Sequence, residues 1–158
     1  MRRKDREVTD IAEIRSILDA AKIMTVAMVD SGKPYALPLH YGYELEEGKL
    51  TLYFHSAPVG RKMEILKENP SVFCTIALDN GLIGVGNNAC VYGCRFASVM
   101  GSGRASILGD TLEKKQALDI LMKHQTGREG FDYPSDLSKV AVVKVALDSF
   151  TCKANKGE

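Results

Sequence analysis

The feature that most constrains this fold is a series of short β-rich runs separated by glycine-containing polar turns. Three such turns occur at Asp30–Lys33, Glu46–Lys49 and Asp79–Gly81, and each follows a segment rich in β-branched or aromatic residues. Runs of this kind predict strands, and strands that follow one another through short turns usually pair with each other in antiparallel fashion. The sequence therefore predicts an antiparallel sheet and not a doubly wound parallel one.

Six strands are expected in all. They are placed at residues 22–29, 34–43, 50–55, 72–78, 96–108 and 140–147, with an extension of the last through residues 150–153. The first three are expected to form an antiparallel meander. Pro34 and Pro38 have no backbone N–H, so the second strand is expected at an edge, at a bulge or against a ligand. Gly101, Gly103 and Gly109 are expected to mark bends or bulges in the fifth strand or just after it.

Three helices are expected around these strands, at residues 10–21, 60–69 and 110–125. Asp10 and Asp110 are each followed three residues later by a glutamate, a pattern typical of a capped helix N-terminus. Asn69-Pro70 ends the second helix, because the residue before a proline avoids the helical conformation. The combined pattern predicts a small β-barrel with peripheral helices.

Length and composition are those of an ordinary globular protein. The 158 residues predict one domain over 1–158, and the net charge of +1 argues against a nucleic-acid or membrane partner. The charged start has no apolar segment directly after it, so the cytoplasm is the expected compartment. The four cysteines lack the spacing of a disulfide framework or a zinc site, and free thiols with no metal are expected. They are Cys74, Cys90, Cys94 and Cys152.

Residues Gly84–Ala89 match the dinucleotide-binding pattern G-x-G-x-x-A in letters only. That pattern needs a strand before it and a helix after it, because the helix N-terminus holds the pyrophosphate. The segment that follows, 90–99, has the composition of a strand. A Rossmann site is therefore not expected, and Leu82–Ala89 is predicted to be a flexible loop.

Two cations stand where a helix normally avoids them. Arg61 and Lys62 directly follow the turn Ser56–Gly60 and open the predicted second helix, whose N-terminus already carries a partial positive charge. This arrangement is explained if an anion binds there, since free N–H groups and the helix dipole both favour one. The sequence therefore predicts a phosphate at 56–62 and a flat aromatic ligand along 38–43. The alternative is a solvated cation pair on a surface helix.

The order of these segments resembles the flavin-binding split barrels related to pyridoxamine 5′-phosphate oxidase, and within them the nitroimidazole-resistance (Nim) group. The segments that carry the resemblance are Met1–Glu7, Pro34–Tyr43, Leu52–Ala57, Gly60–Lys62, Asn69-Pro70, Phe96–Gly103, Glu113–Leu118 and Thr151–Lys153. The resemblance implies a mainly β (α+β) fold, a six-stranded antiparallel split β-barrel with peripheral helices. It also implies a homodimer with two FMN molecules at the subunit interface.

The resemblance further implies which residues surround the flavin. They are Pro38, Leu39, His40, Tyr41, His55, Ser56, Ala57, Gly60, Arg61, Lys62, Ser98 and Val99. Residues 38–41 would lie along the isoalloxazine and residues 55–62 around the ribityl phosphate. Ser98 and Val99 would approach from the same subunit or from its partner. The chain departs from the family at Ala97, where a bulky or charged residue is usual, and in the Leu82–Ala89 loop.

His40 is the expected catalytic residue, because an imidazole above the flavin ring can donate a proton or hold a substrate. A packed or solvent-facing histidine is the alternative. His55 is expected to have a structural or phosphate-side role, and His124 to complement the negative end of a helix dipole. Tyr41 and Tyr43 would either stack on a planar substrate or belong to the core.

The function expected from this resemblance is that of an FMN-dependent oxidoreductase. Electrons would pass from NADH or NADPH to a small planar acceptor such as a nitroaromatic. An enzyme like pyridoxamine 5′-phosphate oxidase is the first alternative, but few further cations are present for a substrate phosphate beyond Arg95, Arg104 and Lys153. A flavin- or haem-binding module without turnover is the second alternative.

Overall fold

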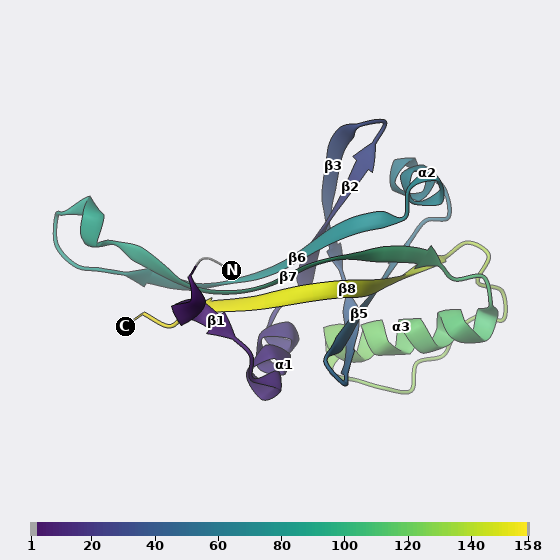
Figure 1. The fold of residues 1–158 in the computed structure, drawn as a ribbon. Helices are drawn as coiled ribbons and strands as arrows, with labels where there is room; N and C mark the ends of the chain where they lie inside the picture. The colour runs from purple at the N-terminus through teal and green to yellow at the C-terminus, as the bar shows by residue number, and fades with distance from the viewer. Residues whose placement is uncertain (1–2, 158) are drawn as a thin grey trace.

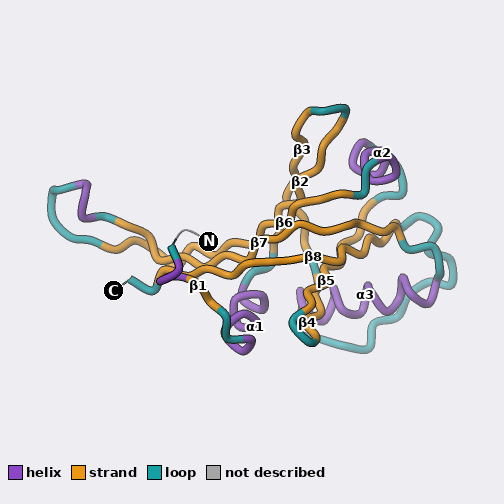
Figure 2. Tube along the Cα trace, in the orientation of Figure 1, coloured by secondary structure: helices purple, strands orange, loops and turns teal. Residues whose placement is uncertain are grey.

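A computed structural model describes residues 3–157, and its described part contains eight strands, three α-helices and two short 3₁₀-helices (Figures 1 and 2). In chain order these are η1 (Lys4–Arg6), β1 (Glu7–Val8), α1 (Ile11–Ala20), β2 (Ile23–Asp30), β3 (Lys33–His40), β4 (Gly42–Glu46), β5 (Lys49–Ser56), α2 (Arg61–Glu68), β6 (Ser71–Ile83), η2 (Ala89–Val91), β7 (Gly93–Ile107), α3 (Thr111–Thr126) and β8 (Ala141–Asn155). Met1 and Arg2, the first residues of the opening segment of the resemblance, lie outside the described residues.

The strands form one antiparallel sheet in the order β3-β2-β6-β7-β8-β5-β4, with β1 paired to β8. The predicted mainly β (α+β) class is confirmed. The described part contains eight strands where six were predicted, because the two-residue strand β1 was not expected and the segment 34–43 divides into β3 and β4. A large apolar cluster contains Met24 and Val26 of β2 together with Leu52 and Phe54 of β5. Residues from both ends of the strand order therefore share one core.

The predicted three-stranded meander is wrong. β3 pairs with β2 and β4 pairs with β5, so the two hairpins lie at opposite ends of the strand order. The chain changes direction at Tyr41, which is 0% exposed and whose hydroxyl donates to the Leu18 carbonyl at 2.9 Å. At Gly42 the backbone passes so close to α3 that a Cβ would lie 2.5 Å from the Leu121 Cα. Burial of the tyrosine and this close approach separate β3 from β4.

The three longest strands, β6, β7 and β8, run side by side through the centre of the molecule (Figure 1). The expected extension of the last strand is confirmed, since β8 continues to Asn155. A bulge falls between Ser102 and Gly103, as the glycines predicted. Gly101 and Gly103 also allow close approach to β8, because added Cβ atoms would lie 2.4 and 2.2 Å from the carbonyl oxygens of Ser149 and Ala146.

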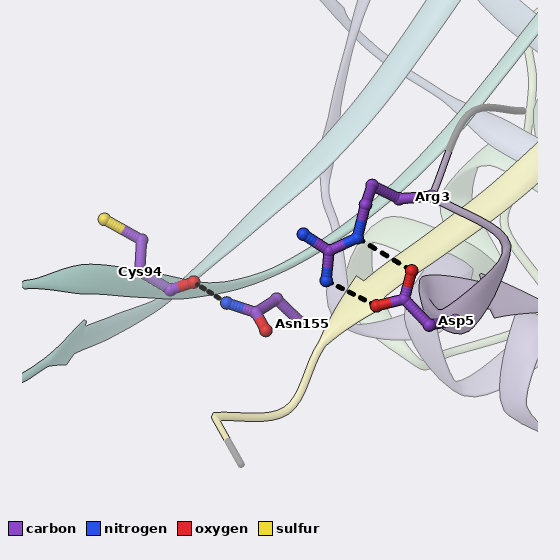
Figure 3. A network of polar contacts seen from close by, with 4 residues as sticks. All are labelled: Arg3, Asp5, Cys94 and Asn155. Carbon is purple, nitrogen blue, oxygen red and sulfur yellow. Dashed lines mark hydrogen bonds and ion pairs between the residues drawn. The ribbon is translucent and has the colours of Figure 1, made fainter.

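The β6–β7 hairpin extends well beyond the body of the sheet (Figures 1 and 2). The expected loop is shorter than predicted, because Leu82 and Ile83 still pair with Cys94 and Gly93. The tip exposes apolar side chains to solvent, with Leu82 70% and Val85 85% exposed. At the base of this hairpin the Asn155 side-chain amide donates to the Cys94 carbonyl at 2.6 Å (Figure 3).

The same region holds the start of the chain. The Arg3 guanidinium donates from Nε to the Asp5 carboxylate at 2.7 Å (Figure 3). This contact lowers the pKa of Asp5 to about 2, mainly through the hydrogen bond from Arg3. The pair lies at the surface in contact with water, so its contribution to stability is small.

Helices α1 and α3 begin directly after Asp10 and Asp110, the two aspartates that were predicted to cap them. The Asp10 carboxylate accepts from the N–H groups of Ala12 and Glu13, and Asp110 accepts in the same way from Leu112 and Glu113. α1 packs near β6 and β7, and α3 lies against β4, β5 and β8. Within residues 3–157, no helix is long and apolar enough to cross a membrane.

Candidate functional site

The predicted ligand-facing strand is an edge of the sheet. Among the described strands β3 pairs only with β2, and it comes near β5 without a ladder of hydrogen bonds between them. A proline in a paired strand must stand where its missing N–H would point away from the partner strand. In an antiparallel pair, successive residues direct their backbone N–H and C=O groups alternately toward the partner strand and away from it. Since the two prolines point away from β2, the backbone groups of positions 34, 36, 38 and 40 all point away from it. The edge therefore presents the N–H groups of Ala36 and His40 and several carbonyl oxygens to a ligand.

A second part of the site is the turn between β5 and α2. Gly60 precedes the helix with φ +117°, a conformation that side chains rarely adopt, and no side chain caps this end. Among the described residues, none accepts a hydrogen bond from the N–H groups of Gly60, Arg61 and Lys62. A helix end with free N–H groups and no cap is suited to an anion.

Ser56 adds a second polar group to this turn. Its side chain is turned to the inner face of β5, the residue is 9% exposed, and its Oγ has no hydrogen-bond partner among the described residues. A buried hydroxyl without a partner costs roughly 1–3 kcal/mol, so native proteins usually satisfy such groups. This unsatisfied hydroxyl and the uncapped helix fit a flavin phosphate.

The two cations of the turn differ in their surroundings. The Arg61 guanidinium donates from Nε to the Asp30 carboxylate at 2.8 Å and stacks over the Tyr35 ring at 4.4 Å. Arg61 therefore links α2 to the tip of the β2–β3 hairpin. Lys62 is half-buried and forms no ion pair with any described residue, so its charge is free to meet an anion. His55 is exposed on the opposite face of β5, away from Ser56.

The predicted flavin residues divide by the face on which they lie. Pro38 and His40 are exposed on the outer face of the sheet, whereas the side chains of Leu39 and Tyr41 point inward and are not available to a ligand on that face. Ser98 is half-exposed on the outer face, and Val99 is 1% exposed in the core. Ala97, where the chain departs from the family pattern, is also buried. Ala57 and Gly60 are exposed in the turn.

Ser98 does not lie beside His40 within one chain. The strand order places β7 three strands from β3, and at about 4.8 Å per strand spacing this separates them by about 14 Å. The single chain thus brings together β3 and the β5–α2 turn but not the Ser98 segment.

The expectation that His124 acts as a charged dipole partner is wrong. The ring is buried against Tyr41 and Tyr43, with ring centroids 4.7 and 5.4 Å away, and its Nε2 lies 3.0 Å from the Ala21 carbonyl oxygen. Burial, with a smaller effect of the Lys22 charge, lowers the pKa of His124. A neutral imidazole in the core accounts for these contacts. Tyr41 and His124 belong to the packing that supports the site.

Gln125 is a site residue that sequence reasoning did not identify. It lies near the end of α3, 85 positions after His40 in the chain, and its Oε1 is 3.0 Å from the Nδ1 of that histidine. A polar side chain in the last turn of a helix is common on any surface, so the sequence carries no signal for this contact. Only the close packing of α3 on Gly42 brings the two residues together.

Comparisons with known proteins agree with this geometry. Residues 10–154 match the family model for pyridoxamine 5′-phosphate oxidase. A provisionally named 5-nitroimidazole antibiotic resistance protein from Bacteroides thetaiotaomicron is 36% identical, with a TM-score of 0.78 over 94% of this chain and 86% of that one. A flavocytochrome from Azotobacter vinelandii is 25% identical, with a TM-score of 0.77 over 99% and 72%.

An FAD-binding protein from Mesorhizobium loti is also 25% identical, with a TM-score of 0.63 over 94% of this chain and 96% of that one. No curated protein sequence matched the chain. The fold and the family match together define a flavin-binding split barrel. The chain belongs to the pyridoxamine 5′-phosphate oxidase family, as its sequence pattern indicated, and it is similar to the nitroimidazole-resistance group within it.

Proposed function

We propose that this chain is an FMN-dependent oxidoreductase that reduces a small planar acceptor such as a nitroaromatic. The observation that carries the proposal is the β5–α2 turn, which combines the unsatisfied Ser56 hydroxyl, the uncapped N–H groups and Lys62, and which Arg61 joins to the β2–β3 hairpin. Family members bind flavins and are often flavin-dependent oxidoreductases, and the name of the 36% identical relative supports the acceptor class.

In this proposal each part of the site has one task. Lys62, Ser56 and the N–H groups of α2 hold the phosphate, and the outward backbone groups of β3 meet the polar edge of the ring. His40, exposed on the outer face at the end of β3, is the proposed catalytic side chain. A bound flavin supplies the redox chemistry, and the chain supplies binding, orientation and electrostatics. NADH or NADPH is the proposed electron donor.

The two alternatives have less support. An oxidase acting on a phosphorylated pyridoxamine needs a second cationic site. Within one chain Lys153 on β8 is several strands from β3, so it could serve only if the second copy supplied it together with its paired residue Ser98. A flavin- or haem-binding module without turnover is compatible with the fold, and the flavocytochrome relative is the reason to test for haem. Neither alternative accounts for the anion site more fully than the proposed function.

An absorption spectrum of the freshly purified protein, recorded before and after anaerobic NADH, tests the proposed function. We expect flavin bands that bleach with NADH and return when a nitroaromatic is added, and we expect the released flavin to be FMN on chromatography. A Soret band would favour the haem-binding alternative. A colourless protein that takes up neither FMN nor FAD would contradict the proposal.

A homodimer is the second part of the proposal, and the outer face of the sheet is its proposed interface. Two rows of paired positions cross five strands on this face, and all ten residues are uncharged and none is buried. The rows are Ala36, Ala27, Phe73, Ser102 and Ser149, and Pro38, Thr25, Thr75, Met100 and Thr151. Since Ser98 is about three strands from β3, its proposed contact with a flavin would come from the second copy.

Light scattering tests the proposed dimer. Replacing Met100, at the centre of the uncharged face, with glutamate should shift the protein from the dimer mass toward the monomer mass, because the substitution would bury a charge in the interface. Gln116→Glu on the exposed side of α3 should leave the dimer mass unchanged. A monomeric mass for the unmodified protein with flavin bound would contradict the interface.

The cytoplasm is the proposed compartment, and the four free thiols agree with a reducing environment.

A further inference from the structure

Among the described residues the His40 side chain has two hydrogen-bonding contacts, one with the Gln125 side chain near the end of α3 and one with the Lys22 carbonyl before β2. The Gln125 side-chain amide nitrogen donates to two backbone carbonyl oxygens, that of Tyr41 at 2.7 Å and that of Lys22 at 3.1 Å. A carbonyl oxygen can only accept, so the NH₂ group of Gln125 must face these two groups. Its Oε1 is therefore fixed on the other side, 3.0 Å from the His40 Nδ1.

This orientation determines where the His40 ring carries its hydrogen. The Nδ1 faces two acceptors, the Gln125 Oε1 at 3.0 Å and the Lys22 carbonyl oxygen at 3.2 Å. Both contacts are hydrogen bonds only if Nδ1 is the donor. The hydrogen bond at one ring nitrogen selects the protonation of the other, so in the neutral ring Nε2 carries a lone pair. His40 is exposed on the outer face, and its Nε2 is left without a protein partner among the described residues.

We propose that Gln125 is a positioning residue that fixes His40 in its Nδ1–H form and presents a bare Nε2 beside the edge of β3. The Nε2 is then a hydrogen-bond acceptor that can bind one proton from water and return it to a ligand next to the strand. The role of Nε2 toward substrate rests on the proposed function. The tautomer itself rests only on the contacts within the chain.

The packing of α3 explains why this arrangement is rigid. The last turn of α3 follows the residues that pass over Gly42, where no side chain could be accommodated between strand and helix. The Lys22 ammonium also donates to the carbonyl of His124 at 2.7 Å, so the chain before β2 is joined to the same helix end. Gln125 thus lies at the junction of three segments, and its amide satisfies backbone groups from two of them.

Nuclear magnetic resonance of protein labelled with ¹⁵N in histidine tests the inference without any flavin. Long-range ¹H–¹⁵N correlations at about pH 8 distinguish the two neutral tautomers, and His40→Gln identifies the His40 signals. We expect His40 almost wholly in the Nδ1–H form. In Gln125→Ala the Nε2–H form, which an unconstrained imidazole favours, should become the majority.

Gln116→Ala, at an exposed position on the same helix, is the matched control and should not alter the His40 signals. The inference is overturned if unmodified protein holds His40 in the Nε2–H form. It is also overturned if Gln125→Ala, folded by circular dichroism, keeps the Nδ1–H form, since the Lys22 carbonyl alone would then suffice.

A kinetic measurement separates this inference from the proposed function. If the protein reduces an acceptor with NADH, Gln125→Ala should lower kcat toward the value of His40→Gln while flavin occupancy stays unchanged. A protein with the predicted tautomer but no flavin would contradict the proposed function alone. An active flavoprotein in which Gln125→Ala changes neither kcat nor the tautomer of His40 would contradict the positioning role alone.

Discussion

Replacing both Arg61 and Lys62 with alanine should lower the affinity for FMN by about a hundredfold or more. Hydrogen bonds to charged groups contribute roughly 1.5–3 kcal/mol each, and each 1.4 kcal/mol is a factor of ten in affinity. Most of the loss should come from Lys62, whose charge has no partner in the described chain, because the Asp30 carboxylate already neutralises part of the Arg61 charge. Titration of apoprotein with FMN, followed by flavin fluorescence, measures the effect.

Lys67→Ala is the control, since this lysine lies in the last turn of the same helix and away from the turn that precedes it. It should leave the FMN affinity within about twofold of the unmodified protein. The two single variants then divide the effect, with Lys62→Ala expected to account for the larger share. A double variant that still purifies fully loaded with FMN would show that the phosphate does not bind at this turn.

The strand and helix signals of this sequence are local, and for that reason most elements were predictable. The aspartate caps of α1 and α3 and the bulge near Gly103 follow from residues adjacent in the chain. The partner of each strand is not a local property. The segment 34–43 has the composition of one strand, but burial of the Tyr41 side chain under α1 divides it, and its halves join different hairpins.

The candidate site divides in the same way. The turn at 56–62 could be singled out from the sequence because two cations at a helix N-terminus conflict with the dipole, and an anion at this turn stays a prediction. The pairing of Arg61 with Asp30 and the contact of His40 with Gln125 join residues 31 and 85 positions apart, and no pattern in the sequence signals either contact. His124 gave a misleading signal, because its place at a helix end favours a charged role while its burial among tyrosines favours the neutral ring.

Replacing Gly42 with alanine should be among the most destabilising single-methyl changes in this chain. The added Cβ would lie 2.5 Å from the Leu121 Cα, 2.6 Å from its nitrogen and 2.8 Å from the Ile120 carbonyl carbon. All three are backbone atoms, so no side-chain rotation relieves the overlap and α3 must move away from β4. Overpacking of this kind typically costs about 1–3 kcal/mol, and a site closed by backbone should lie at or above the upper end of that range.

For a chain of this length, about 3 kcal/mol corresponds to a fall in Tm of about 6–12 °C, which differential scanning calorimetry measures. Gly109→Ala is the matched control, because its added Cβ meets no atom within 4 Å and its backbone φ lies outside the left-handed region. It should change Tm by no more than about 2 °C. Equal Tm values for the two variants would mean that α3 is not seated against Gly42. The packing of α3 on Gly42 also brings Gln125 to His40, so Gly42→Ala should lower the population of the Nδ1–H form of His40. This second effect distinguishes a displacement of α3 from a general loss of packing in the core.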